Sequence, residues 1–137
     1  MEAYEPLLRS DWAIYRGGAV LLDATENMSI KDCEFTNLGG NVIFVSGYNR
    51  DTKITGNHIH DSGASAISFV GDASAVRSPL FQYFNTTAIE DMDTIVGPKN
   101  ELYPSSCLVE NNLIHKIGRV EKQVAGVQIS MAMKIHV

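Results

Sequence analysis

The chain has 137 residues, of which 45% are hydrophobic and 20% charged, and its formal net charge is −5. This composition is ordinary for one folded domain with a modest core. The net negative charge argues against a nucleic-acid partner, because the sequence has no cluster of basic residues that could bind phosphates. No apolar run approaches the roughly 18 residues that a transmembrane helix needs, so we expect no membrane partner.

The N-terminal residues 1–16 precede the first repeated pattern. Residues 1–12 are charged and lack the apolar segment of a signal peptide. Trp12 and Tyr15 are expected in an N-terminal strand or cap that covers an open end of the fold.

An internal repeat occupies most of the chain after residue 16. Three ten-residue segments share an aliphatic residue, an apolar residue five positions later and a glycine nine positions later: 30–39, 54–63 and 109–118. The second begins 24 residues after the first, and the third begins 55 residues after the second. Short apolar stretches recur in the same order between them, at 20–22, 43–45, 67–69 and 127–129.

Short β-branched strands at this interval predict a parallel β-solenoid, in which each turn of the chain pairs with the next. Aliphatic side chains at matching positions would then stack into a continuous core. Asn57 and Asn112 occupy one repeat position, where asparagine can adopt left-handed backbone geometry and bond to its counterpart one turn away. Cys33 would be the small apolar substitute at the end of this ladder.

By this register, Val137 would begin a further repeat, so we interpret the chain as a piece of a longer solenoid. A last turn without a following one exposes strand edges and apolar surface. We therefore expect self-association through the C-terminal turn.

The repeat resembles the right-handed parallel β-helix proteins of the pectate-lyase-like superfamily, over roughly residues 17–137. The carrying segments are GNVIFV at 40–45, ITGNHIHD at 54–61 and VENNLI at 109–114. More narrowly, VGDASAVRSP at 70–79 and GRVEKQ at 118–123 are similar to a bacterial group of β-helix proteins assigned as glycosyl hydrolases.

This resemblance implies an all-β fold, a right-handed parallel β-helix of about three to four coils with one long insertion at residues 70–106. It implies a carbohydrate-active protein that acts on a polysaccharide or oligosaccharide, in an extracellular or periplasmic location. Three alternatives stay open: a non-catalytic glycan-binding or structural module, an inactive fragment of an enzyme, and a polysaccharide lyase.

The insertion at 70–106 and a shorter one after Gly118 are the predicted binding surface, because insertions project from one side of a solenoid. Both border the same strand column, so we expect them to lie close together along one groove. Glycoside hydrolysis requires two carboxyl groups, and Asp72 and Glu121 are the predicted catalytic pair. The residues predicted to bind substrate are Arg77, Ser68, Arg119, Lys122 and Gln128, with Ser68 and Gln128 facing outward on the groove floor.

Structural roles compete with each of these assignments. Asp72 follows a glycine and could cap a turn, Glu121 could belong to a solvated ion-paired loop, and Arg77 could form a structural salt bridge. We expect no cofactor; calcium held by Asp91 and Asp93 is the weaker alternative, which a lyase would favour.

Histidines form a second group. His58 and His60 flank the inward-facing Ile59, and His60 aligns with His115 one turn away at a spacing of about 4.8 Å. Such a group could bind a transition metal, but we interpret it as a surface ladder and predict no metal site. The two cysteines show no zinc-ligand spacing and leave a single disulfide open.

Overall fold

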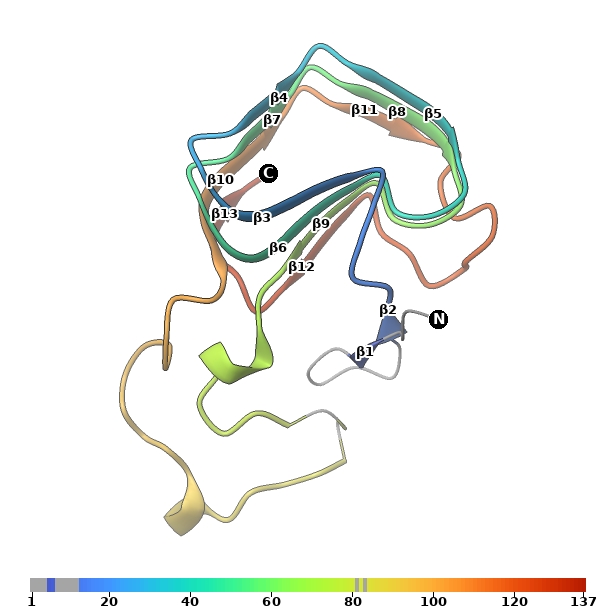
Figure 1. The fold of residues 1–137 in the computed structure, drawn as a ribbon. Helices are drawn as coiled ribbons and strands as arrows, with labels where there is room; N and C mark the ends of the chain where they lie inside the picture. Colours follow the sequence, from blue (N-terminus) through green and yellow to red (C-terminus); the bar gives the residue numbers. More distant parts are fainter. Residues whose placement is uncertain (1–4, 7–12, 81, 83) are drawn as a thin grey trace.

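The computed structural model describes residues 5–6, 13–80, 82 and 84–137, and these are mostly β-strands (Figure 1). The short N-terminal strands β1 (Glu5–Pro6) and β2 (Ala13–Ile14) pair antiparallel. Every other strand pair in the described part of the chain is parallel. The predicted all-β class with parallel pairing is therefore confirmed.

The parallel strands lie in three columns, which successive stretches of the chain join in the same order (Figure 1). The first column contains β3 (Val20–Glu26), β6 (Ile43–Arg50), β9 (Ile67–Val70) and β12 (Val127–Ser130). The second contains β4 (Ser29–Lys31), β7 (Lys53–Thr55), β10 (Pro104–Glu110) and β13 (Met133–His136). The third contains β5 (Glu34–Leu38), β8 (His58–Ser62) and β11 (Leu113–His115). Because β10 also pairs with the end of β6, the first two columns form one eight-stranded sheet among the described residues.

Strand register follows the sequence repeat. Ile54 pairs with Ile30 on one side and Val109 on the other. Ile59 and Ile54 have no exposed surface and belong to a single apolar cluster that joins the columns. In-register pairing of parallel strands places residues from the same repeat position above one another. Burial of each of these aliphatic side chains stabilises the fold by about 1.5–3 kcal/mol.

The corners between strands use left-handed backbone at repeated positions. Asp32, Gly56 and Asn111 precede the third column and have φ values of 53°, 67° and 55°. Asparagine, aspartate and glycine tolerate this conformation better than other residues do. The left-handed residue is thus the one before the ladder position, whereas the sequence interpretation assigned it to Asn57 and Asn112.

The predicted asparagine ladder is present. The Asn57 side chain donates to the Asn112 Oδ1 atom at 2.9 Å and to the Ile30 carbonyl at 3.0 Å. Its own Oδ1 atom accepts from the Cys33 amide at 3.0 Å. Cys33 therefore ends the ladder as expected, although its side chain is exposed.

N-terminal residues cover the outer face of the first column rather than an end of the stack. Ile14 is buried against Phe44 and Val70, which point away from the main apolar cluster. The Arg16 guanidinium group donates to the Ser46 hydroxyl at 2.9 Å and the Val70 carbonyl at 3.0 Å. The predicted cap residue Trp12 lies outside the described residues.

The long insertion leaves the stack after β9 and returns at β10 (Figure 1). Within the described residues it contains two 3-10 turns, η1 (Ala73–Ala75) and η2 (Ile89–Asp91). No helix in the described ranges is long and apolar enough to cross a membrane.

Candidate functional site

Asp72 and Glu121 lie at opposite ends of the first strand column. Asp72 follows β9, whereas Glu121 belongs to the loop that precedes β12, the parallel neighbour of β9. Because β9 and β12 are parallel, a loop that follows β9 lies at one end of the sheet and a loop that precedes β12 lies at the other. The four-residue strand between the two loops spans about 10 Å, so the predicted groove with both carboxyl groups is not assembled.

Asp72 caps a turn. Its Oδ1 atom accepts a hydrogen bond from the Ser74 amide at 2.8 Å, at the start of η1. The hydrogen bonds from the Ser74 side chain and backbone lower the pKa of the Asp72 carboxyl below its ordinary value. A general acid of a glycosidase needs a raised pKa, so this environment suits a cap better than an acid.

Arg77 holds the insertion together. Its guanidinium group forms an ion pair with Asp93 at 2.7 Å and donates to the carbonyls of Gly97 at 2.9 Å and Pro98 at 3.3 Å. Arg77 and the Ile95 amide lower the pKa of Asp93. Since Arg77 already occupies the Asp93 carboxylate, the pairing of Asp91 and Asp93 around calcium has no support from these contacts.

The other predicted binding residues are dispersed. Ser68 has no exposed surface, because the N-terminal segment covers the outer face of β9; its predicted place on a groove floor is therefore wrong. Its neighbour in register, Gln128, is half-buried. Arg119 forms an ion pair with Asp61 at 2.7 Å, and the Lys122 ammonium donates to the Gly118 carbonyl at 2.9 Å.

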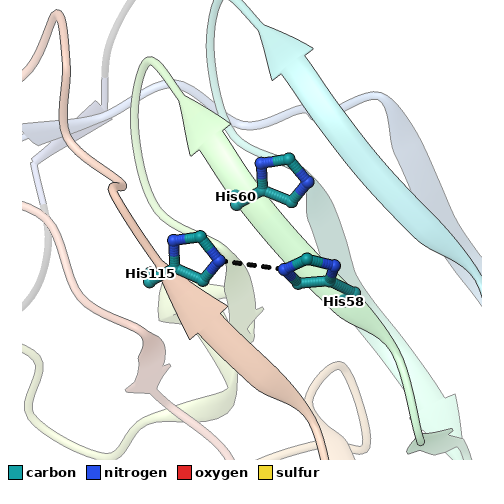
Figure 2. A group of neighbouring side chains, drawn as sticks. All are labelled: His58, His60 and His115. Carbon is teal, nitrogen blue, oxygen red and sulfur yellow. Dashed lines mark hydrogen bonds between the residues drawn. The ribbon is translucent and has the colours of Figure 1, made fainter.

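Three imidazole rings meet on the outer face of the third column (Figure 2). His58 and His60 project from the same face of β8, and His115 pairs with His60 from the adjacent β11. The Nε2 atoms of His58 and His115 are 2.9 Å apart, and the His60 and His115 rings stack with centroids 5.2 Å apart. One ring nitrogen from each histidine lies within 4.8 Å of the others. The predicted alignment of His60 with His115 is confirmed, and the three rings form a cluster.

Two carboxylates adjoin this cluster. The His60 Nδ1 atom contacts Asp61 at 2.8 Å, and its Nε2 atom contacts Glu34 at 3.1 Å. The hydrogen bond to Asp61, followed by the one to Glu34, raises the pKa of His60. Asp61 is itself held by Arg119, so the ring orientation of His60 is fixed through two contacts.

No family model, no curated protein and no solved structure matches this chain. The functional conclusion therefore depends on the chemistry of the side chains.

A polar pocket of about 460 Å³ opens at the corner between the first and second columns. It is lined by Asn27, Met28, Ser29, Asp51 and Lys53. Asn27 and Asp51 occupy the same corner in successive turns, and both have left-handed backbone with φ of 55°. The corner therefore recurs with the sequence repeat. This pocket was not predicted from the sequence, because the insertions were expected to bind the substrate. The 24-residue spacing of Asn27 and Asp51 is the sequence feature that marks it.

An apolar pocket of about 290 Å³ lies between the insertion and the last turn. Its lining includes Val76, Arg77, Tyr103 and Met131. Arg50 packs over the Tyr103 ring at 4.8 Å and donates to the Tyr103 carbonyl. These contacts tie the insertion to the columns.

Proposed function

We propose that this chain forms a right-handed parallel β-helix of about three to four coils and binds a polysaccharide or oligosaccharide outside the cytoplasm. The resemblance of the repeat to the pectate-lyase-like β-helix proteins supports this proposal, as does the parallel pairing of strands from successive turns. A stack of this kind presents a long face to a linear polymer.

The polar pocket at Asn27, Ser29, Asp51 and Lys53 is the observation that carries the binding proposal. Sugar hydroxyl groups need both hydrogen-bond donors and acceptors, and this lining supplies an amide, a hydroxyl, a carboxylate and an ammonium group. The volume of about 460 Å³ lies in the range of small-molecule sites.

Binding without hydrolysis is the form of the proposal that the geometry favours. A glycosidase pair must lie about 5–9.5 Å apart across the bond that breaks, and Asp72 and Glu121 border opposite ends of the first column. Hydrolysis by this pair and cleavage by a lyase remain the alternatives. Both would release sugars, which are measured in the binding experiment.

A panel of soluble neutral and acidic polysaccharides tests the proposal by affinity electrophoresis and calorimetry, with released sugars measured in the same samples. We expect saturable binding by at least one polymer, weakened tenfold or more by Asp51→Asn or Lys53→Gln. Asn keeps the left-handed backbone at position 51 and removes only the charge. Asp91→Asn and Lys99→Gln make the same changes on the exposed insertion and are the matched controls.

Absence of binding across the panel, or equal weakening by the control variants, would contradict the proposed binding function. If the wild-type chain releases sugar and the folded Asp72→Asn or Glu121→Gln variant does not, the result would instead support a hydrolase.

A further inference from the structure

We propose that His58, His60 and His115 bind one divalent transition-metal ion, best matched by Zn²⁺, with Glu34 as the fourth ligand. Three imidazoles and a carboxylate are a donor set that suits zinc. The site is independent of the polar pocket, because it lies on the outer face of the third column.

The donor atoms lie close enough together to converge on one small ion. Ligands of a tetrahedral zinc site lie about 2.0–2.1 Å from the metal and hence about 3.3–3.4 Å from one another. The His58 and His115 Nε2 atoms are 2.9 Å apart, and the His60 Nε2 and Glu34 Oε1 atoms are 3.1 Å apart. One ring nitrogen from each histidine lies within 4.8 Å of the others, so the rings must approach by up to about 1.4 Å to reach zinc-ligand spacing. The exposed Glu34 side chain can turn toward the same ion.

The surroundings of His60 are those of a metal ligand. Its Nδ1 atom is held by Asp61 at 2.8 Å, and its Nε2 atom faces Glu34 at 3.1 Å, so an ion would replace the contact between Nε2 and Glu34. Arg119 holds the other oxygen of Asp61 at 2.7 Å. A carboxylate behind a ligating imidazole fixes its tautomer and strengthens its basicity, as in many zinc sites.

Without an ion, the Nε2 atoms of His58 and His115 face each other. The 2.9 Å contact between two Nε2 atoms is a hydrogen bond only when one of the two rings donates a proton to the other. A cation placed among the rings accepts a lone pair from each neutral imidazole at once, and the negative charges of Glu34 and Asp61 favour it.

The ligands come from three successive turns of the chain, Glu34 on β5, His58 and His60 on β8, and His115 on β11. Parallel pairing fixes the backbone positions of all four residues before an ion binds. A bound ion would clamp the three turns together, and it would stabilise the folded chain because the unfolded chain cannot present the same ligands together.

Calorimetric titration of the chelator-treated full chain with ZnCl₂ tests the site. We expect one zinc per chain and a rise in the melting temperature of about 5–10 °C at a hundredfold excess over Kd. Co²⁺ in place of Zn²⁺ should give the visible absorption of a four-coordinate ion. His115→Gln and His60→Gln should abolish one-to-one binding and the thermal shift.

His136→Gln is the matched control, because His136 is the fourth histidine of the chain and lies exposed on β13, away from the cluster. Glu34→Gln and Asp61→Asn change no histidine and should weaken binding about 10–100-fold with an unchanged circular dichroism spectrum. These two variants keep the test decisive even if a histidine variant does not fold.

No stoichiometric zinc binding by the wild-type chain would overturn the proposal. So would equal affinities of the wild type and the folded Glu34→Gln and Asp61→Asn variants, or a loss in His136→Gln as large as that in His115→Gln.

Discussion

Asn57 and Asn112 join neighbouring turns of the chain through a side-chain hydrogen bond of 2.9 Å in the interior of the stack. Asn57 is 1% exposed. Its side chain also donates to the Ile30 carbonyl and accepts from the Cys33 backbone amide, at 3.0 Å each. Buried donors and acceptors that lose their partner cost about 1–3 kcal/mol each. The ladder therefore couples three turns through one side chain.

Replacing Asn57 by Ala should lower the free energy of unfolding by about 2–4 kcal/mol, because it leaves the Cys33 amide and the Ile30 carbonyl without partners. Urea denaturation followed by circular dichroism measures this change. Asn85→Ala, on the exposed insertion, is the control and should change stability by less than about 0.5 kcal/mol. Equal effects of the two substitutions would contradict the role of the ladder.

Gly63, which lies between β8 and β9, allows two backbones to touch. A Cβ atom at Gly63 would lie 2.0 Å from the Gly39 carbonyl oxygen, closer than any real contact. Gly63→Ala should therefore destabilise the fold by more than about 2 kcal/mol, because backbone must move to admit the methyl group. Gly39→Ala places its Cβ in open space and should change stability by less than about 1 kcal/mol. Thermal unfolding compares the two; a Gly63→Ala protein as stable as Gly39→Ala would contradict the close approach.

The register of the columns could be predicted from sequence because stacking demands similar side chains at equal positions. Ile30, Ile54 and Val109 repeat at one position, and each pairs with the next as expected. The left-handed corners were harder to place, because asparagine and aspartate serve both as corner residues and as ladder residues. The structure separates the roles: Gly56 makes the corner and Asn57 makes the ladder.

The candidate sites were less predictable, since they depend on contacts between segments without a repeat. Burial of Ser68 follows from packing of Ile14 and Arg16 over the first column, which no spacing in the sequence indicates. The opposite placement of Asp72 and Glu121 was readable from element order, because one follows a strand and the other precedes one. Alignment of His60 with His115 was predictable, but the approach of their nitrogens to Glu34 depends on side-chain rotamers.

The two cysteines should differ strongly in reactivity. Both are free; Cys33 is exposed, and Cys107 has no exposed surface. Burial raises the pKa of the Cys107 thiol, and the thiolate is the reactive form. Native protein should therefore take up one equivalent of iodoacetamide at Cys33, and a second only on unfolding, as peptide mass spectrometry can show. Cys33→Ser should remove the fast reaction; rapid native labelling at Cys107 would contradict its burial.

Asp72 should contribute to stability only where it is ionised. Hydrogen bonds from Ser74 lower its folded-state pKa below the unfolded value of about 3.8. Its contribution is therefore present above that value and is lost as the pH falls through the lower folded-state pKa. Asp72→Asn keeps the capping shape without the charge, so it should cost up to about 1 kcal/mol at pH 7 and less than that at pH 2. Urea midpoints at the two pH values measure this, with Asp91→Asn as control, and a cost that is equal at both would contradict the role of the charge.

The last strands of the columns present an open edge within the described part of the chain. β12 and β11 end their sheets, and β13 pairs with β10 alone. Ile129 on β12 is 45% exposed although its register partner, Phe69, is fully buried. Unpaired edges with apolar side chains favour association with another copy.

We therefore expect a concentration-dependent shift from monomer toward dimer or larger species in sedimentation velocity. Ile129→Lys should suppress this shift, because a charged side chain at an edge opposes stacking of a second copy. Val96→Lys adds the same charge at an apolar residue that is 96% exposed on the insertion, and should leave association unchanged. A wild-type protein that stays monomeric over a hundredfold range of concentration would show that these edges do not pair.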